Sequence, residues 1–319
     1  MFQASRGVLA PGAQKKAPTL LRWRLTLGIV FVAALTALCW LDAQAGRPGI
    51  VLAVLAITVA ALAAGEMRRL YRQRGVELST SAVYLGALLP VIVSSVTIFF
   101  PLLQLNPTLG CAGWLAMGLA FGLMAAFAGE MCRYDAPGQS IINVAHASLA
   151  VLYIGGLVGM LVQLRIVNAP NEIIGWRGLY PLLATIATVK LSDIGQYVVG
   201  RTIGKHKLAP LISPGKTWEG AVGGILLATL IAAAVMATLN QGTRGLRPSY
   251  FLVVWAFALT VAVAGLLGDL AESLLKRDAG VKDSSDWMPG FGGVLDLLDS
   301  ILFAAPVAYM WWVIGFLGP

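Results

Sequence analysis

Nine long apolar segments, separated by short polar ones, follow one another along the chain. A membrane-spanning helix needs about 20 mostly apolar residues. The segments are rich in Ala, Leu and Val and lack the alternation of a strand, which favours helices. The sequence therefore predicts an all-α integral membrane protein with about nine transmembrane helices, at roughly 25–41, 49–65, 82–103, 109–131, 143–164, 177–197, 220–239, 249–270 and 297–317.

The polar segments suggest a division into a short tail and two halves. Residues 1–24 form a basic N-terminal tail, and residues 25–170 a first transmembrane bundle. Residues 171–319 form a second transmembrane domain, whose loops 198–219 and 271–296 hold most of its charge and are dense in Gly, Pro and Ser. This second domain is where we expect the chemistry.

Composition excludes several classes of protein. Apolar residues make up 58% of the chain and charged residues 12%, whereas soluble domains have about 45–50% and about 25%. A soluble enzyme, a disordered chain and a disulfide-stapled secreted domain are excluded. The cysteines Cys39, Cys111 and Cys132 lack the spacing of a metal site, so we interpret them as packing residues.

The positive charges predict the orientation in the membrane. With the N-terminus in the cytoplasm, 17 Lys and Arg residues lie on the cytoplasmic side and five lie outside, while Lys190 lies within a span. This asymmetry predicts a cytoplasmic N-terminus and an external C-terminus. It also accounts for the net charge of +8 without a nucleic-acid partner. Residues 43–45 resemble a signal-peptidase site, but the long basic region before the first span argues against cleavage.

Charged residues at membrane depth are costly and therefore informative. The N-terminal half offers almost none: we interpret Glu130 as a helix-end residue and His146 as a satisfied core histidine. The two charged segments of the C-terminal half differ from this pattern.

The first charged segment contains Gly215-Lys216-Thr217, which looks like the end of a phosphate-binding P-loop. That motif needs a glycine where Pro210 stands, and no strand precedes it, so we reject this interpretation. Ser213, Lys216 and Thr217 nevertheless offer two hydroxyls and a cation before a helix N-terminus, a combination that suits phosphate. The alternative is a basic loop lying at the lipid headgroups.

The second charged segment places acids on both sides of a flexible turn. Asp269, Glu272 and Lys276 share one helix face, and Asp296 and Asp299 form a second acidic pair one turn apart. The glycine-rich turn 289–293 would fold the second pair back against the first. Carboxylates beside cations are how proteins hold Mg²⁺ together with a polyphosphate. The alternative, solvated headgroup charges, leaves unexplained why acids enter two spans on the same side.

These residues resemble the signature of the phosphatidate cytidylyltransferase (CDP-diacylglycerol synthase) family. The upstream runs 193–197, 204–208 and 213–220 are also similar to that family. Phe291 and Leu297 depart from it, since they stand where the family has a histidine and an arginine. The positions in register are Ser273, Lys276, Arg277, Lys282, Asp283, Ser285, Pro289, Gly292, Gly293, Asp296 and Asp299.

The resemblance implies the reaction of CTP with phosphatidate to give CDP-diacylglycerol and pyrophosphate. It implies Mg²⁺ held by Asp269, Asp296 and Asp299, with Asp283 a weaker candidate and a second cation left open. Two further roles follow for this chain: Lys276, Arg277 and Lys282 neutralise phosphates, and Ser213, Lys216, Thr217, Glu219 and Ser273 bind substrate. Asp193 and Lys190 are either catalytic or a structural ion pair.

Location and partners complete the expectation. We expect a multi-pass protein of the cell inner membrane whose active site faces the cytoplasm and borders the bilayer. The small pairs Gly155-Gly156 and Gly223-Gly224 leave a homodimer open. The departures keep two alternatives open, another lipid phosphate as acceptor and an inactive relative with a scaffold role. A transporter is disfavoured, because the charges are confined to one half and no internal repeat is visible.

Overall fold

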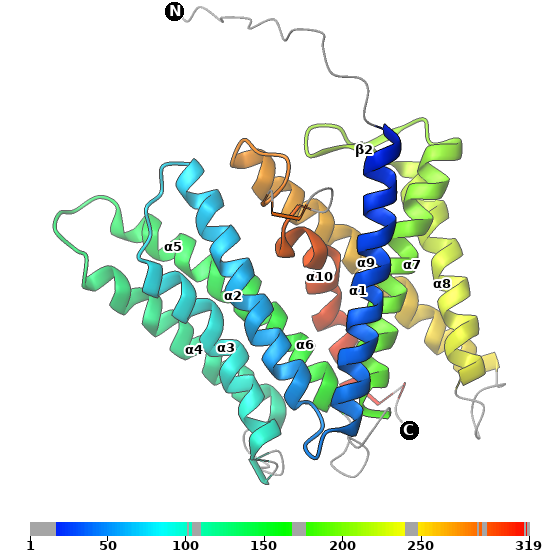
Figure 1. Ribbon diagram of the computed structural model, residues 1–319, viewed down its shortest axis with the longest axis horizontal. Coiled ribbons are helices and arrows are strands. Elements are labelled where there is room, and N and C mark those ends of the chain that lie inside the picture. The colour runs from blue at the N-terminus through cyan, green and yellow to red at the C-terminus, as the bar shows by residue number, and fades with distance from the viewer. Residues whose placement is uncertain are drawn as a thin grey trace, which may run out of the picture.

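The fold is a bundle of long helices that run between two ends of the molecule (Figure 1). A computed structural model describes residues 17–100, 102–103, 110–167, 177–239, 248–285, 287–288, 292–315 and 317. Its helices are α1 (Ala17–Gln44), α2 (Ile50–Gln73), α3 (Thr80–Phe99), α4 (Gly110–Met131), α5 (Ser140–Ala150), α6 (Leu157–Ile166), α7 (Tyr180–Ile203), α8 (Trp218–Leu239), α9 (Pro248–Asp278) and α10 (Val294–Val313).

A π-helical turn, Val151–Gly156, joins α5 to α6 into one continuous span. With α5 and α6 counted together, the described residues contain nine helices long and apolar enough to cross a membrane. The prediction of an all-α multi-pass membrane protein is confirmed. Most of α1 is exposed along its length, including Ile29 and Val32, as expected for a lipid-facing helix.

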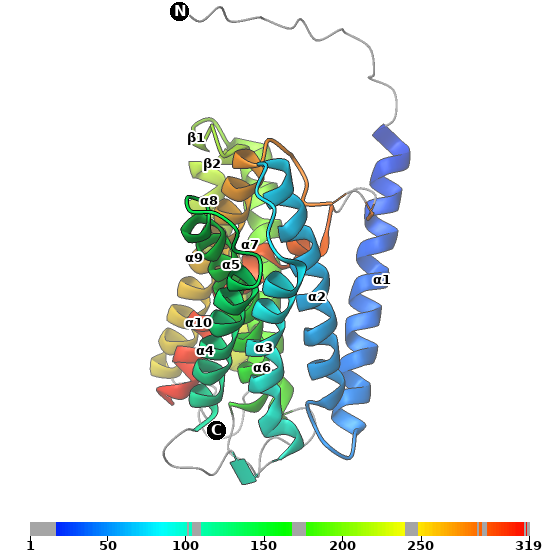
Figure 2. The same ribbon diagram turned by 90° about the vertical axis from the view of Figure 1, so that its left-hand side faces the viewer.

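Successive spans alternate in direction, which gathers the polar connections of interest at one end. Both views place the start of α1, the hairpin between α7 and α8 and the segment joining α9 to α10 at the same end (Figures 1 and 2). The hairpin consists of antiparallel strands β1 (Lys207–Ala209) and β2 (Ser213–Thr217). The predicted tail lies largely outside the described residues, which begin at 17.

The helix ends differ from the predicted loop bounds. Helix α9 continues to Asp278, about two turns beyond the predicted span, and this confirms that Asp269, Glu272 and Lys276 lie on one helix. Helix α10 begins at Val294, which puts Asp296 and Asp299 in its first two turns. The loops predicted at 198–219 and 271–296 are therefore shorter, 204–217 and 279–293, because polar residues continue the helices past the apolar segments.

Two buried clusters of apolar side chains form the core, and α10 contributes to both. Leu295 and Leu302 pack in the cluster built mainly by α2, α3, α5 and α6. Ile301 and Ala305 pack in the cluster built mainly by α7, α8 and α9. The helix that carries the late acidic pair is thus held between the two halves of the molecule.

The glycine pairs proposed for a homodimer are used inside the chain. A Cβ at Gly155 would overlap Pro90 and the backbone of Ala87, and one at Gly224 would overlap the backbone of Gln196. These glycines allow close helix contacts within one molecule, so they no longer support a homodimer, which stays a prediction.

The structure tests the residues that we interpreted as purely structural, namely Glu130, His146 and the cysteines. Glu130 ends α4 and accepts a hydrogen bond from Asn143 Nδ2 at 3.0 Å, and His146 stacks edge-on against Tyr71. The interpretation of Glu130 is confirmed, whereas His146 is satisfied, with Nδ1 2.7 Å from the carbonyl oxygen of Ile142, but half-buried, so it is not a core residue. Cys39 is buried as predicted, but Cys132 is exposed beyond the end of α4, so the packing interpretation is wrong there. The side chain of Cys111 lies outside the described residues.

Candidate active site

The hairpin and α9 are joined by an ion pair at the centre of the candidate site. Lys216 Nζ lies 2.6 Å from Asp269 Oδ2, and both side chains are largely buried. Ser273, one turn along α9, donates to Asp269 Oδ1 at 3.4 Å. The structure therefore brings together a lysine from one charged segment and an aspartate from the other, which the sequence had placed more than 50 residues apart.

A second ion-pair group joins α9 to α10. Lys276 Nζ contacts Glu272 on its own helix and lies 2.5 Å from Asp296 Oδ1. Glu272 is fully buried and Lys276 nearly so. The prediction that the turn returns the late acidic pair to the early one is confirmed by this contact.

Asp296 and Asp299 lie one turn apart on α10 but in different surroundings. Asp296 Oδ2 accepts hydrogen bonds from Ser284 N, Ser284 Oγ and Gly293 N at 2.9, 2.5 and 2.8 Å. Asp299 is 9% exposed, and its only hydrogen bond among the described residues comes from the backbone N–H of Ser300. Asp296 is saturated within the protein, whereas Asp299 has free acceptor capacity.

Asp269 and Asp299 approach each other across the α9–α10 contact. A Cβ at Gly268 would overlap the main-chain oxygen of Asp299, so the two backbones touch beside Asp269. The two carboxylates repel each other electrostatically, and Asp193 adds to the negative charge around Asp299. Within the described part of the chain, no three His, Cys, Asp or Glu side chains form a cluster that could hold a metal ion alone.

Lys190 and Asp193 form an ion pair on α7, which leaves their catalytic or structural role open. Lys190 Nζ lies 3.4 Å from Asp193 Oδ2 and donates to the carbonyl oxygen of Leu297 at 3.3 Å. Ser300 of α10 donates to the other Asp193 oxygen at 3.4 Å. The ammonium group therefore lies against the backbone of Leu297, one of the two positions that depart from the signature. The other, Phe291, lies outside the described residues.

Besides Lys216 and Ser273, two more of the predicted substrate-binding residues have partners within the protein. The Thr217 hydroxyl accepts from Gly220 N at 3.1 Å, which caps the N-terminus of α8. Glu219 accepts from the backbone N–H groups of Lys205 and His206 and from the His206 ring. These contacts close the base of the hairpin, and contact of either residue with substrate stays a prediction.

The remaining predicted residues lie at the rim. Ser213 is half-buried at the start of β2. Arg277 is exposed and donates from Nε to the carbonyl of Ile212, which ties α9 to the hairpin. Lys282 and Asp283 are exposed, and neither makes an ion pair within the described residues. They are placed to meet a ligand arriving from solvent and are separated from the buried carboxylates.

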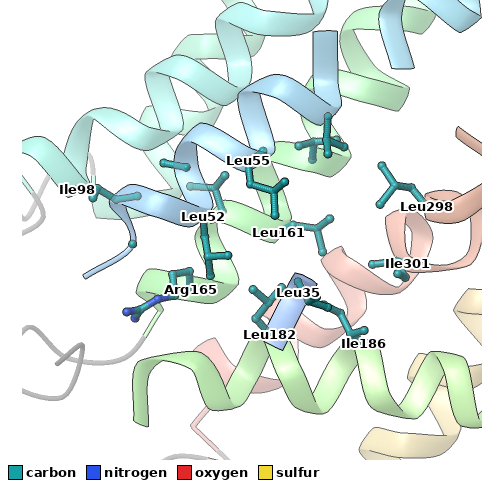
Figure 3. A pocket seen from close by; sticks show the side chains of 16 residues that line it. Leu35, Leu52, Leu55, Ile98, Leu161, Arg165, Leu182, Ile186, Leu298 and Ile301 are labelled. Atoms are coloured by element: carbon teal, nitrogen blue, oxygen red, sulfur yellow. The ribbon is translucent and has the colours of Figure 1, made fainter. Parts of the chain in front are cut away.

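An apolar cavity adjoins the polar site. It has a volume of about 170 Å³ and lies among α1, α2, α3, α6, α7 and α10. Leu298 and Ile301, which flank Asp299 and Ser300 on α10, line one end, and Arg165 lies at the other (Figure 3). Apart from Arg165, the lining residues are all apolar. The carboxylates thus stand next to space that suits hydrocarbon.

Sequence reasoning missed three buried charges in the N-terminal half, so the expectation that it holds almost none is wrong. Arg165 Nε pairs with Asp42 Oδ2 at 2.8 Å, and both side chains are buried. Glu66 is 7% exposed and accepts hydrogen bonds from the start of α10. Each lies at or just past the end of an apolar segment, where a charge is ordinarily interpreted as a loop residue. A carboxylate directly after an apolar run was the available signal.

Comparison with known proteins places the sequence in a family. The sequence model of the Cytidylyltransferase family matches residues 22–314. The chain belongs to the Cytidylyltransferase family. The match covers the first transmembrane bundle as well as the two charged segments, so the whole bundle is a family feature.

Three relatives within this group are named phosphatidate cytidylyltransferase. The one from Haemophilus influenzae is 45% identical over 131 residues, covering 41% of this chain and 45% of the relative. The one from Bacillus subtilis is 39% identical over 167 residues, covering 52% and 57%. The one from Pseudomonas aeruginosa is 42% identical over 155 residues, covering 45% and 55%. The chain thus spans about half the length of the curated relatives it matches.

Proposed function

We propose that this protein is a phosphatidate cytidylyltransferase, transferring CMP from CTP to phosphatidate to give CDP-diacylglycerol and pyrophosphate. The observation that carries the proposal is the adjacency of two environments in a family member. A cluster of carboxylates and lysines suits a nucleotide, and an apolar cavity that begins at the same turn of α10 suits a lipid. The relatives' names supply the reaction.

The chemistry asks the protein mainly for positioning and charge neutralisation. An oxygen of the lipid phosphate attacks the α-phosphorus of CTP, and the bond from that phosphorus to the oxygen of the β-phosphate breaks. Pyrophosphate leaves with the bonding electrons. Because a phosphate dianion is already a nucleophile, no general base is required.

Lys216 and Lys276 are the cations closest to the buried carboxylates. Lys216 pairs with Asp269, and Lys276 pairs with Glu272 and Asp296. We infer that the substrate's phosphates replace part of these ion pairs. Arg277 and Lys282, at the rim, would meet the triphosphate as it enters.

The donor set fits Mg²⁺. This ion prefers oxygen ligands and is commonly held by one or two carboxylates together with substrate phosphates. Asp269 and Asp299 would supply these two, because their mutual repulsion and the burial of Asp299 favour a bound cation, although Lys190 offsets part of the charge at Asp299 and Lys216 that at Asp269. Asp296, also predicted as a ligand, would first have to exchange Lys276. When bound, the ion supplies Lewis-acid neutralisation of the phosphate oxygens.

The proposed location follows from the same arrangement. The site lies at the end of the bundle where the hairpin and the α9–α10 segment meet. That end carries the basic segments, which favours the cytoplasmic face of an inner membrane. Soluble CTP would then enter from the cytoplasm, and the lipid from the bilayer.

The direct test is turnover by purified protein in mixed micelles. CTP labelled at the α-phosphate is supplied with phosphatidate, and with an isoprenyl phosphate in a parallel reaction, each with Mg²⁺ or with EDTA. We expect Mg²⁺-dependent release of pyrophosphate and a CDP-lipid identified by mass spectrometry with phosphatidate only. If only the isoprenyl phosphate gave a product, the proposed acceptor would be wrong and the protein would act on a different lipid phosphate. Absence of Mg²⁺-dependent CTP binding would reject the enzyme and favour the scaffold alternative.

A further inference from the structure

Glu66 is a buried carboxylate that lies on α2, outside both charged segments. Its two oxygens lie within hydrogen-bond distance of four donors, all from the stretch between α9 and the first turn of α10; one of them, the Ser284 hydroxyl, is shared with Asp296. Oε1 accepts from Trp287 Nε1 at 3.0 Å and Val294 N at 2.9 Å. Oε2 accepts from Ser284 Oγ at 3.0 Å and Leu295 N at 2.8 Å. The side chain is 7% exposed, so these donors replace water.

Val294 and Leu295 are the first two residues of α10. The first amides of a helix have no partner within the helix and are usually capped by a side chain just before it. Gly293 stands there and has no side chain to offer. Glu66, which lies on a different helix and 228 residues away in the sequence, caps these amides instead. Its negative charge also lies at the positive end of the helix dipole.

Asp296 completes the same network from within α10. It accepts from Gly293 N and Ser284 N, and it pairs with Lys276 of α9. The Ser284 hydroxyl lies within hydrogen-bond distance of both Asp296 Oδ2 and Glu66 Oε2. Glu66 thus holds the start of α10 from α2, and Asp296 holds it through Lys276 of α9 and Ser284; together they fix the rotation of this helix.

Two glycines before α10 leave room for the carboxylates of Glu66 and Asp296. A Cβ at Gly293 would overlap both oxygens of Glu66 and the hydroxyl of Ser284. Gly292 has φ +82°, a left-handed conformation that side chains disfavour, and a Cβ there would overlap Asp296. The two glycines let the two carboxylates reach the backbone.

We propose that Glu66 is a positioning residue of the active site, which fixes the first turns of α10 and thereby the directions of Asp296 and Asp299. The inference rests on the proposed function, and it assigns to the first bundle a direct part in the catalytic geometry. Residues that orient the ligands of a metal typically change affinity or activity about 10- to 100-fold when altered.

The test compares Glu66→Gln and Glu66→Asp with a matched control, Glu130→Gln. Glu130 is another glutamate of the first bundle with a side-chain partner, but it contacts Asn143 instead of α10. For each purified variant we would measure kcat, the KM for CTP, the Mg²⁺ concentration at half-maximal rate, thermal unfolding in detergent and hydrogen exchange of the 279–296 segment.

We expect Glu66→Gln to lower kcat about 10- to 100-fold and to raise the Mg²⁺ requirement, with a change below about threefold in the KM for CTP. Its amide group would face N–H donors, so hydrogen exchange at 294–295 should increase. Glu66→Asp keeps the charge and should recover part of kcat. Glu130→Gln should match the wild type in kcat and Mg²⁺ requirement.

A merely structural role gives a different result. It would lower the unfolding temperature of Glu66→Gln while kcat per folded molecule and the Mg²⁺ requirement stay at wild-type values, and this would overturn the proposal. As a second measurement, Trp287→Phe removes one donor to Glu66. Its effect on kcat should be smaller in the Glu66→Gln background than in the wild type. Full additivity would also reject the proposal, whereas inactivity of the wild type with CTP and phosphatidate rejects the proposed function instead.

Discussion

Asp296 and Asp299 differ in what surrounds them, although they have the same charge and lie on the same helix. Asp296 has a lysine and three hydrogen-bond donors from the protein. Asp299 has a single backbone donor from its neighbour and faces the negative Asp269. A carboxylate satisfied by its own protein maintains structure, whereas one left with free acceptors and a like-charged neighbour is available to a cation.

This difference predicts that substitution of Asp299 lowers activity alone, whereas substitution of Asp296 lowers both activity and stability. Asp299→Asn should lower kcat about 10²- to 10³-fold without lowering the thermal unfolding temperature, because it removes a buried repulsion. Asp296→Asn should lower both, since an amide cannot satisfy Lys276 and the donors of Ser284 and Gly293 together. Turnover and unfolding in detergent measure the two effects. A wild-type unfolding temperature for Asp296→Asn would contradict the structural assignment.

Among the elements, the start of α10 depends most on close approach. Gly293→Ala should destabilise the protein by about 1–3 kcal/mol, the usual cost of overpacking, because the new methyl group overlaps Glu66. Gly46→Ala is the control, since a Cβ there meets nothing within 4 Å. Unfolding by denaturant in detergent compares the two variants. Equal midpoints would mean that Glu66 can move aside without loss.

The elements also show where prediction from the sequence succeeds. Hydropathy sets the number and kind of helices, because burial in lipid demands long apolar runs. It places their ends less well: Asp269 and Lys276 continue α9 because i, i+3 and i+4 contacts stabilise a polar helix as readily as an apolar one. The motif residues of the C-terminal half were found because they are dense and fixed in spacing.

Contacts between distant elements could not be predicted. Glu66 and Asp42 look like ordinary loop charges until their partners, Val294 and Arg165, are brought to them by packing. A carboxylate directly after an apolar run was the only local signal, and the partner of each residue depends on tertiary structure.

The buried pair of Asp42 and Arg165 supports the helix ends away from the active site. Asp42 also accepts from the backbone N–H groups of Gly49, Val51 and Leu52, at the start of α2. Arg165→Met should destabilise the protein by about 3–5 kcal/mol, because it leaves a buried carboxylate without its cation. Adding Asp42→Asn should restore part of the loss. The free energies of unfolding of the single and double variants are measured with a chemical denaturant. A double variant less stable than Arg165→Met would show that the unpaired carboxylate is not the cause of the lost stability.

At the scale of the whole molecule, the arrangement separates two tasks. One end of the bundle carries the hairpin, the lysines and the carboxylates, and the apolar cavity extends from there toward Arg165 at the other (Figures 1 and 3). Leu35 of the largely exposed α1 forms part of the cavity wall. A lipid could thus enter between α1 and the rest of the bundle without crossing the polar end.

This arrangement requires that the end carrying the active site face the cytoplasm, and the chain's own cysteines make that testable. Cys132 is exposed on the connection between α4 and α5, at the same end as the hairpin, while Cys39 is buried. In a Cys111→Ser background, a membrane-impermeant thiol reagent should label Cys132 in inside-out vesicles and leave it unlabelled in right-side-out ones. Gly46→Cys, on the exposed turn between α1 and α2, should show the opposite pattern in a background that also lacks Cys132. Labelling of Cys132 from the outer face would place the site away from CTP, and the proposed reaction could not then use the cytoplasmic nucleotide pool.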